Sequence, residues 1–195
     1  MKPTENKHCR YPGQKGIAAV EFALILPLMI IMAFVIIDFG GLIEARLIVA
    51  NLAREGGSLA SRDVLPASSL ITMLQDGASP LNLVTNGRIY IWSINAGTSA
   101  QNPDPYIDPT VSANGGGLSV SSSIGNGQAN LGLTPQLYSY LEFDNSPGKK
   151  TADISNVTVV EVFYKYTPIT PISRFVPGLL AGAGGGTIIS SKAVF

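Results

Sequence analysis

Reactive side chains are scarce in this sequence of 195 residues. It holds one histidine, His8, and one cysteine, Cys9, and both precede residue 16. A lone thiol cannot form an intramolecular disulfide, and neither residue has partners at the spacing of a zinc site. No serine has the context of a nucleophile elbow, and Asp104 and Asp108 fall in a loop without a general-acid setting. The sequence therefore predicts no catalytic residue, no metal ligand and no cofactor, and we expect a protein that is not an enzyme.

Charge is also sparse, and it is unevenly distributed. Charged residues make up 13% of the chain and hydrophobic residues 46%, which is typical of a single-span membrane protein rather than a soluble enzyme. Residues 1–16 hold four basic residues and one acidic residue, a net charge of +3, and the remainder carries nine basic and twelve acidic residues. No basic patch indicates a nucleic-acid partner.

What the chain does have is one long apolar run, residues 17–37, in which Glu21 is the one ionisable side chain. About 20 apolar residues, each rising about 1.5 Å along a helix, cross a hydrocarbon core of about 30 Å. The run predicts a membrane-spanning helix. The alternative, a buried core helix, needs a large domain around it, and the rest of the chain is short and polar in its middle. Pro27 lacks an amide hydrogen, which predicts a helix kink near residues 23–27.

The charge asymmetry predicts how this helix is oriented. Flanks rich in lysine and arginine stay in the cytoplasm, so we expect a cytoplasmic N-terminus and an exported chain after about residue 40. An ordinary secretory signal has a shorter apolar region that ends in a small-residue cleavage site. The prediction is a single-pass membrane protein.

Glu21 is the residue of the apolar run that indicates a function. A carboxylate in the hydrocarbon region costs on the order of 2.5 kcal/mol or more unless it is paired, so such residues are functional candidates. The alternative is that Glu21 extends its carboxylate to the headgroups, since it lies about 6 Å along the helix axis from Ile17. Gly16 precedes Glu21 by five residues, and Phe22 follows it directly.

The order Gly16-x-x-x-x-Glu21-Phe22 before an apolar helix resembles the type IV prepilin processing site. More narrowly, the chain resembles the TadE-like (TadE/TadG-type) pseudopilins of tight-adherence (Flp/Tad) pilus systems. The segments that carry this resemblance are Ala18–Leu24, Leu26-Pro27-Leu28, Asp38-Phe39-Gly40, Asn51–Gly56, Tyr166-Thr167-Pro168 and Gly184–Ser190.

The resemblance implies a minor pseudopilin that a prepilin peptidase cleaves between Gly16 and Ile17. Glycine suits such a site because a residue without a side chain lets the protease backbone approach closely. The implied location is the bacterial inner (cytoplasmic) membrane or a pilus, and the implied partners are the peptidase, other pseudopilins or pilin subunits, and the assembly platform. Glu21 is then expected to meet the Ile17 amine of a neighbouring subunit. The alternatives are a signal-anchored exported adhesin or receptor domain and an anchored periplasmic enzyme.

The whole sequence divides into a basic leader (1–16), a long helix (17–62) and an exported α+β domain (63–195). Within the last part we expect a helix from about residue 65 to residue 76, strands at 88–94, 156–166 and 187–195, and a long loop at 95–135 with at most a short strand near 118–124. A short helix at 173–180 and a glycine hinge at 182–186 are also predicted.

These elements predict a small antiparallel sheet packed on the exported part of the long helix. Alternation along 156–166 places Val157, Val159 and Glu161 on one face and Val160 and Val162 on the other. Gly40-Gly41 is expected to loosen the helix where it leaves the membrane. The acidic and amide residues of the long loop, Asp104, Asp108 and Asn114, lack EF-hand spacing, and we interpret them as turn residues rather than calcium ligands.

Overall fold

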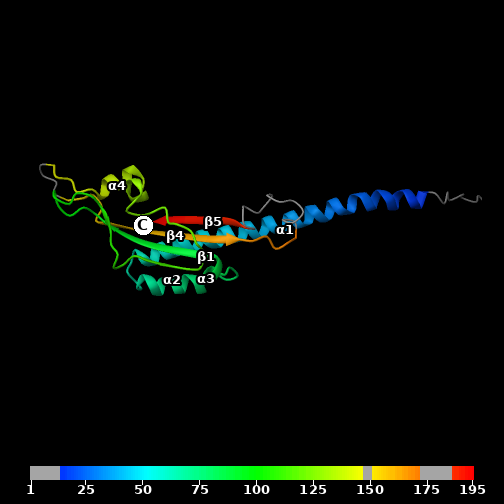
Figure 1. Cartoon of the computed structure of the whole chain (residues 1–195), viewed down its shortest axis with the longest axis horizontal. Coiled ribbons are helices and arrows are strands. Elements are labelled where there is room, and N and C mark those ends of the chain that lie inside the picture. Colours follow the sequence, from blue (N-terminus) through cyan, green and yellow to red (C-terminus); the bar gives the residue numbers. More distant parts are fainter. Residues whose placement is uncertain (1–13, 147–150, 172–185) are drawn as a thin grey trace, which may run out of the picture.

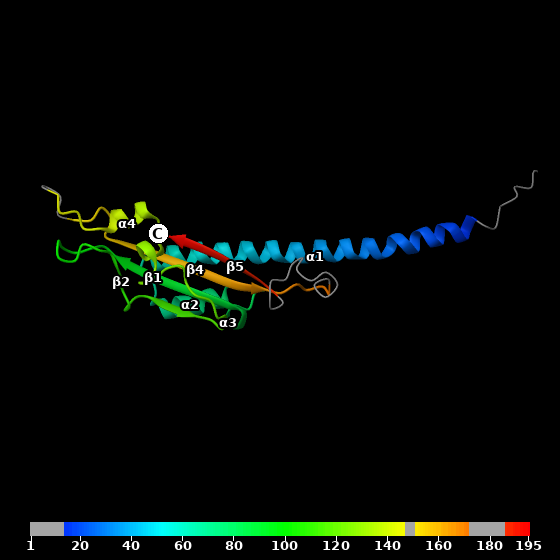
Figure 2. The same ribbon diagram turned by 45° about the horizontal axis from the view of Figure 1, so that its top comes forward.

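A long helix, α1 (Gln14–Ala60), runs along most of the length of the molecule (Figure 1). The computed structural model describes residues 14–146, 151–171 and 186–195. The C-terminal half of α1 lies along a small sheet, and its N-terminal half extends beyond the sheet as a rod (Figures 1 and 2). The helix continues without a break through Pro27 and ends within two residues of the predicted boundary at 62.

The sheet has five antiparallel strands. They are β1 (Gly87–Asn95), β2 (Tyr106–Ile107), β3 (Ala113–Gly115), β4 (Asn156–Tyr166) and β5 (Thr187–Val194). The strand order is β2-β1-β4-β5, with β3 also pairing with β1. Every pairing is antiparallel, and the β1–β4 register places Ile91 opposite Val160. The predicted α+β architecture is confirmed, as are the three longer strands.

The two faces of the sheet bury different clusters. On one face, Ile91, Val160 and Val162 pack against Ala45 and Val49 of α1. Helix α2 (Ala67–Asp76) adds its own buried side chains to this cluster: Leu70, Ile71 and Leu74. On the other face, the buried residues are Ile94, Ala96, Ile124, Leu133, Leu141, Val157 and Val159. The alternation predicted for 156–166 is therefore confirmed, and it gives the sheet a core on each side.

Small residues let α1 lie close to the sheet. A side chain at Gly56 would meet Leu74 at 2.7 Å and Val160 at 3.3 Å. At Gly41, an added Cβ would come within 2.7 Å of the Tyr166 hydroxyl. The predicted loosening at Gly40-Gly41 does not interrupt the helix, since α1 is continuous there. Packing of Gly41 against Tyr166 stabilises a helix that the two glycines would weaken in isolation.

Residues 118–124, where the sequence allowed at most a short strand, form no strand. They cross a face of the sheet instead of pairing along its edge, because side chains of β1 bind them. The Tyr90 hydroxyl donates to the Val120 carbonyl at 2.6 Å, and Trp92 Nε1 donates to Ser122 Oγ at 2.8 Å. The short strands of this loop are β2 and β3.

Three short helices were not predicted from the sequence: α3 (Leu83–Asn86), the 3₁₀ helix η1 (Ala129–Gly132) and α4 (Pro135–Leu141). A recognisable signal was present for α4, because Thr134 caps it by accepting from the Leu137 amide and Pro135 occupies its first turn. The predicted helix at 173–180 and most of the predicted hinge lie outside the described residues.

Candidate functional site

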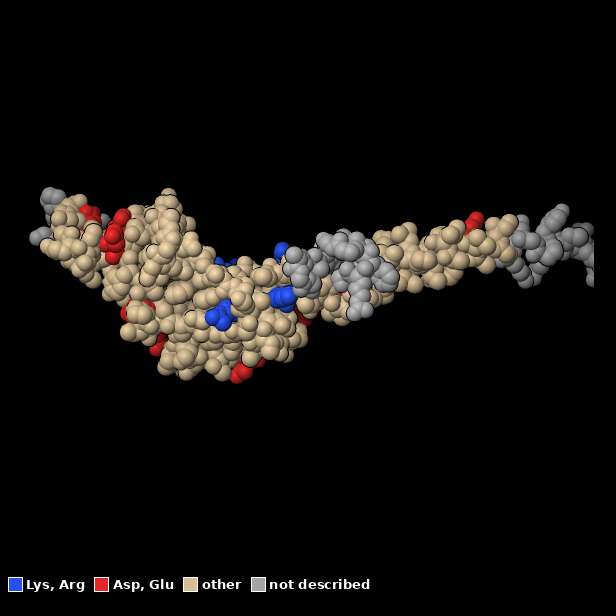
Figure 3. Space-filling view, viewed as in Figure 1, with Lys and Arg blue, Asp and Glu red and all other residues tan. Residues whose placement is uncertain are grey.

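The N-terminal arm, residues 16–37 of α1, has almost no contact with the other described parts of the chain. Large apolar side chains are exposed along it, from Ile17 (62% exposed) through Leu24 (75%) to Ile36 (68%). Few charged atoms are visible on this rod in Figure 3. By length and composition, α1 is the one described helix that could cross a membrane. An uncovered apolar surface of this size needs a lipid or protein environment, because it is unfavourable in water.

The predicted site residues lie at the outer end of this arm. Glu21 follows Ile17 by four residues, so the two lie on the same side of the helix, about one turn apart. Phe22 is 61% exposed, and Glu21 makes no hydrogen bond or ion pair with the described residues. Nothing lies within 4 Å of the position that a Cβ would take at Gly16. These residues are thus presented together on an unobstructed helix, and their roles stay predictions.

A second acidic residue of α1 has the opposite surroundings. The Asp38 side chain is completely buried. Its Oδ1 accepts from the amides of Ile169 (2.9 Å) and Thr170 (3.0 Å), and its Oδ2 accepts from the Thr170 hydroxyl. Tyr166 donates its hydroxyl to the Asp38 carbonyl at 2.9 Å. We call these four residues the Asp38 clasp.

The clasp joins segments 128 residues apart where the arm meets the sheet. Burial, followed by the charge of Asp38 and by Tyr164, raises the pKa of Tyr166, which keeps its hydroxyl protonated and able to donate. Sequence reasoning singled out Asp38-Phe39-Gly40 and Tyr166-Thr167-Pro168 separately. The structure brings the two together as a single contact.

Residues 16–58 match the family model described as TadE-like protein. This segment is similar to TadE-like proteins. No curated protein and no solved structure has a significant match to the chain. The match confirms the resemblance over α1 and leaves its later parts, at 166–168 and 184–190, as predictions.

The matched segment, residues 16–58, comprises both the arm and almost all of the helix surface that packs on the sheet. Asp38, Gly41, Ala45, Val49 and Gly56 fall within it. Its partners in the sheet, such as Tyr166 and Val160, lie outside it. The matched residues therefore provide one side of the helix–sheet contact.

A buried carboxylate on the opposite face of the sheet was not recognised as important from the sequence. Glu161 is 2% exposed and accepts from the hydroxyls of Ser122 and Ser123, and from the Ser123 amide at 3.2 Å. Lys192 donates to Ser123 Oγ and to the Gly132 carbonyl, both at 3.2 Å. The sequence signal that could have identified Glu161 is its position between apolar residues of a predicted strand. Its arrangement attaches the long loop to the sheet, so we interpret it as structural.

The sequence predicts that Asp108 is a turn residue, and its carboxylate accepts hydrogen bonds from neighbouring loop residues as in a turn. Its Oδ1 accepts from the amide (2.8 Å) and the hydroxyl (2.6 Å) of Thr110, and its Oδ2 accepts from Asn95 Nδ2 at 3.2 Å. Among the described residues, no group of three or more histidine, cysteine, aspartate or glutamate side chains could hold a metal ion.

Proposed function

We propose that this protein is a pseudopilin-like subunit that is cleaved between Gly16 and Ile17 and takes part in assembling or initiating a tight-adherence pilus. The TadE-like match indicates a Tad pilus-associated protein. The proposal of cleavage and assembly rests on the arm. The rest of the described chain leaves its apolar surface uncovered, and this surface contains one carboxylate, Glu21. The proposed role is structural rather than enzymatic.

The physical argument concerns two charges. Cleavage before Ile17 creates an amine, and Glu21 lies one helical turn away on the same side of the helix. Each charge is unfavourable in lipid by itself. Pairing the Glu21 carboxylate with the Ile17 amine of a neighbouring subunit removes both costs while the exposed apolar side chains of the two arms pack together.

The same proposal includes location and partners. The basic leader favours a cytoplasmic N-terminus, with the sheet on the far side of the bacterial inner membrane. The partners are then the prepilin peptidase, other pseudopilin or pilin subunits and the assembly platform in that membrane. Anchoring by a single helix is consistent with α1, the described helix long and apolar enough to span a bilayer.

Replacing Glu21 by glutamine tests the assembly role. We expect Glu21→Gln to insert into the membrane normally but to lose co-purification with pilus components and to abolish pili. Removing one partner of a desolvated charge pair typically costs about 3–5 kcal/mol, enough to disrupt assembly. The measurement is co-purification and electron microscopy of pili, with the intact mass of the variant determined in parallel to record its processing.

Glu44→Gln is the matched control, because Glu44 is also an exposed carboxylate on α1 but lies within the half that packs on the sheet. It should assemble like the natural protein. Normal pili and normal partner binding by a correctly inserted Glu21→Gln protein would contradict the proposal and would favour the adhesin or receptor alternative.

A further inference from the structure

The length of the arm places the surface of a bilayer at the Asp38 clasp. Residues 17–37 rise about 31 Å as a helix, which matches a hydrocarbon core of about 30 Å. The headgroup region adds about 5–7 Å on each side. Because α1 continues through this boundary without a break, the residues that directly follow the arm lie at the depth of the headgroups. The sheet begins immediately beyond them.

The loop after β4, which Asp38 holds, presents an apolar side chain at this depth. Asp38 binds the amides of Ile169 and Thr170, so the loop is fixed beside the first residue past the arm. Ile169 is nevertheless 76% exposed. Its Cδ1 lies 3.6 Å from the position that a Cβ would take at Gly41, which is about 6 Å along the helix axis from Ile37. The fold thus fixes the backbone of an isoleucine whose side chain it leaves uncovered.

Exposed apolar side chains lie on the other side of α1 at a similar depth. Phe39 is 43% exposed and Ile43 is 56% exposed. They are four residues apart and share one side of the helix, whereas Gly41, two residues from each, faces the opposite side. Helical side chains lean toward the N-terminus, so Ile43 extends back toward the arm. We call Phe39, Ile43 and Ile169 the apolar collar, since they flank α1 on two sides where the arm ends.

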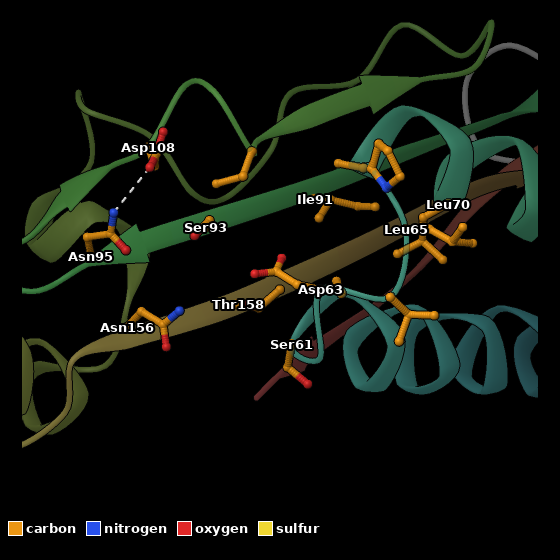
Figure 4. A pocket seen from close by; sticks show the side chains of 15 residues that line it. Ser61, Asp63, Leu65, Leu70, Ile91, Ser93, Asn95, Asp108, Asn156 and Thr158 are labelled. Carbon is orange, nitrogen blue, oxygen red and sulfur yellow. Dashed lines mark hydrogen bonds between the residues drawn. The ribbon is translucent and has the colours of Figure 1, made fainter.

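The head, by which we mean the described residues after residue 37, has a different character at its far end. Where the sheet extends past the end of α1, the polar side chains of Ser61, Asp63, Asn95 and Asn156 line a pocket (Figure 4). Most of the aspartate and glutamate atoms visible on the head in Figure 3 lie toward this far end, and lysine and arginine atoms lie nearer the arm. The head is therefore polarised along α1, with its apolar collar at the end next to the arm.

Two basic residues lie just behind the apolar collar. Arg46 is exposed on α1, and Lys165 directly precedes Tyr166 at the end of β4. Long basic side chains can extend toward lipid phosphates while their aliphatic parts cover apolar surface. Between residues 38 and 50, Glu44 is the one exposed acidic residue. Apolar side chains followed by an excess of positive charge are typical of a surface that contacts phospholipid headgroups.

We propose that the head docks on the bilayer that the arm spans, with the apolar collar in the headgroup layer and with Arg46 and Lys165 directed toward the lipid phosphates. The partner of this surface is a phospholipid layer. The proposal rests on the membrane-spanning arm of the proposed function, but not on cleavage after Gly16 or on Glu21. It gives the head a fixed height above the membrane.

Nitroxide spin labels test this contact. Cys9 is the one cysteine of the chain, so a Cys9→Ser protein takes a single label at each introduced cysteine. Ile169→Cys and Phe39→Cys place labels on the two sides of the apolar collar. The full-length proteins are reconstituted in vesicles of phosphatidylethanolamine and phosphatidylglycerol. Electron paramagnetic resonance power saturation then measures collisions of each label with oxygen, which concentrates in lipid, and with a nickel–EDDA complex, which stays in water.

Val194→Cys is the matched control, because Val194 is an apolar residue that is 42% exposed, close to the 43% of Phe39. It pairs with Val159 in the sheet, far along β4 from the clasp. We expect the two collar labels to collide severalfold less often with the nickel complex than the Val194 label does, and more often with oxygen. A label at Met29, an exposed residue in the middle of the arm, reports whether the arm spans the bilayer.

The possible results separate the docking from the membrane-spanning arm. A Met29 label in lipid, together with collar labels that collide with the nickel complex as often as the Val194 label, would overturn the docking and leave the arm in place. A Met29 label in water would contradict both. Collar labels that collide rarely with both reagents would show coverage by protein, such as a second copy of the chain, and would also overturn the proposal. Circular dichroism checks that each variant is folded.

Discussion

Two acidic residues of α1, each followed directly by phenylalanine, have opposite surroundings. Glu21 is exposed on the arm, and Asp38 is buried with three donors around its carboxylate. A buried carboxylate with hydrogen bonds to each oxygen is a structural element. An exposed carboxylate on an apolar helix requires a partner from elsewhere. We therefore propose separate roles for the two residues, an intermolecular contact for Glu21 and a contact within the fold for Asp38.

Gly16 gives a prediction at the scale of one residue. We expect a mature N-terminus at Ile17 when the prepilin peptidase is present, and we expect Gly16→Val to block maturation, because a side chain prevents close approach of the protease backbone. The substitution should not disturb α1, since nothing lies within 4 Å of the added Cβ. Intact-mass measurement of protein from the native host distinguishes the cleaved from the full-length species.

Gly40→Val is a suitable control for this experiment, because Gly40 is likewise a position on α1 with open space around an added Cβ. It should be processed normally. Retention of residues 1–16 by the natural protein, or normal cleavage of the Gly16→Val protein, would contradict the predicted processing.

At the scale of elements, α1 has two kinds of glycine. Gly56 packs against Leu74 and Val160, both of them fully buried, whereas Gly40 has nothing near it. An alanine in an open helical position stabilises a helix by up to about 1 kcal/mol relative to glycine. An alanine in a tightly packed contact forces neighbouring atoms apart, which costs about 1–3 kcal/mol.

We therefore expect Gly40→Ala to raise the melting temperature slightly and Gly56→Ala to lower it. The measurement is thermal unfolding of each full-length variant in the same detergent, followed by near-ultraviolet circular dichroism, which reports the packing of Trp92 and the tyrosines. A destabilised Gly40→Ala protein with an unaffected Gly56→Ala protein would show that the helix–sheet contact is looser than described.

The elements differ in how far the sequence predicts them. The strand at 156–166 was predicted to the residue because its alternation is long and rich in β-branched side chains. Residues 118–124 alternate only briefly and are rich in serine, and Tyr90 and Trp92 bind them from a distant strand. The end of α1 at Ala60 and the positive φ of Asp63 in the turn after it belong to the packing of the helix on the sheet. Local pattern does not contain that relationship.

At the scale of the whole molecule, the Asp38 clasp connects the arm to the sheet. Two of its residues, Asp38 and Tyr166, were visible in the sequence within two short motifs, but their contact spans 128 residues and follows from the fold. We expect Asp38→Ala to lower the free energy of unfolding by about 1–3 kcal/mol, since the amides of Ile169 and Thr170 lose their carboxylate acceptor in a part-buried contact.

Hydrogen exchange measures this effect where it arises. The amides of Ile169 and Thr170 should exchange much faster in Asp38→Ala, whereas Asp38→Asn, which keeps an oxygen that can accept from both, should have a smaller effect. Asp76→Ala, at an exposed carboxylate, should change neither exchange nor stability. Unchanged protection of the two amides in Asp38→Ala would contradict the clasp.

The continuity of α1 also has a mechanical consequence. A helix of 47 residues is about 70 Å long, and one end of it is the arm while the other lies lengthwise on β4 and β5. Tension applied along the arm reaches the sheet as shear parallel to the helix axis, so that many side-chain contacts bear the load at once instead of separating one after another. The hydrogen bonds of Asp38 would bear this tension first, because Asp38 lies where the uncovered arm meets the part of α1 that packs on the sheet.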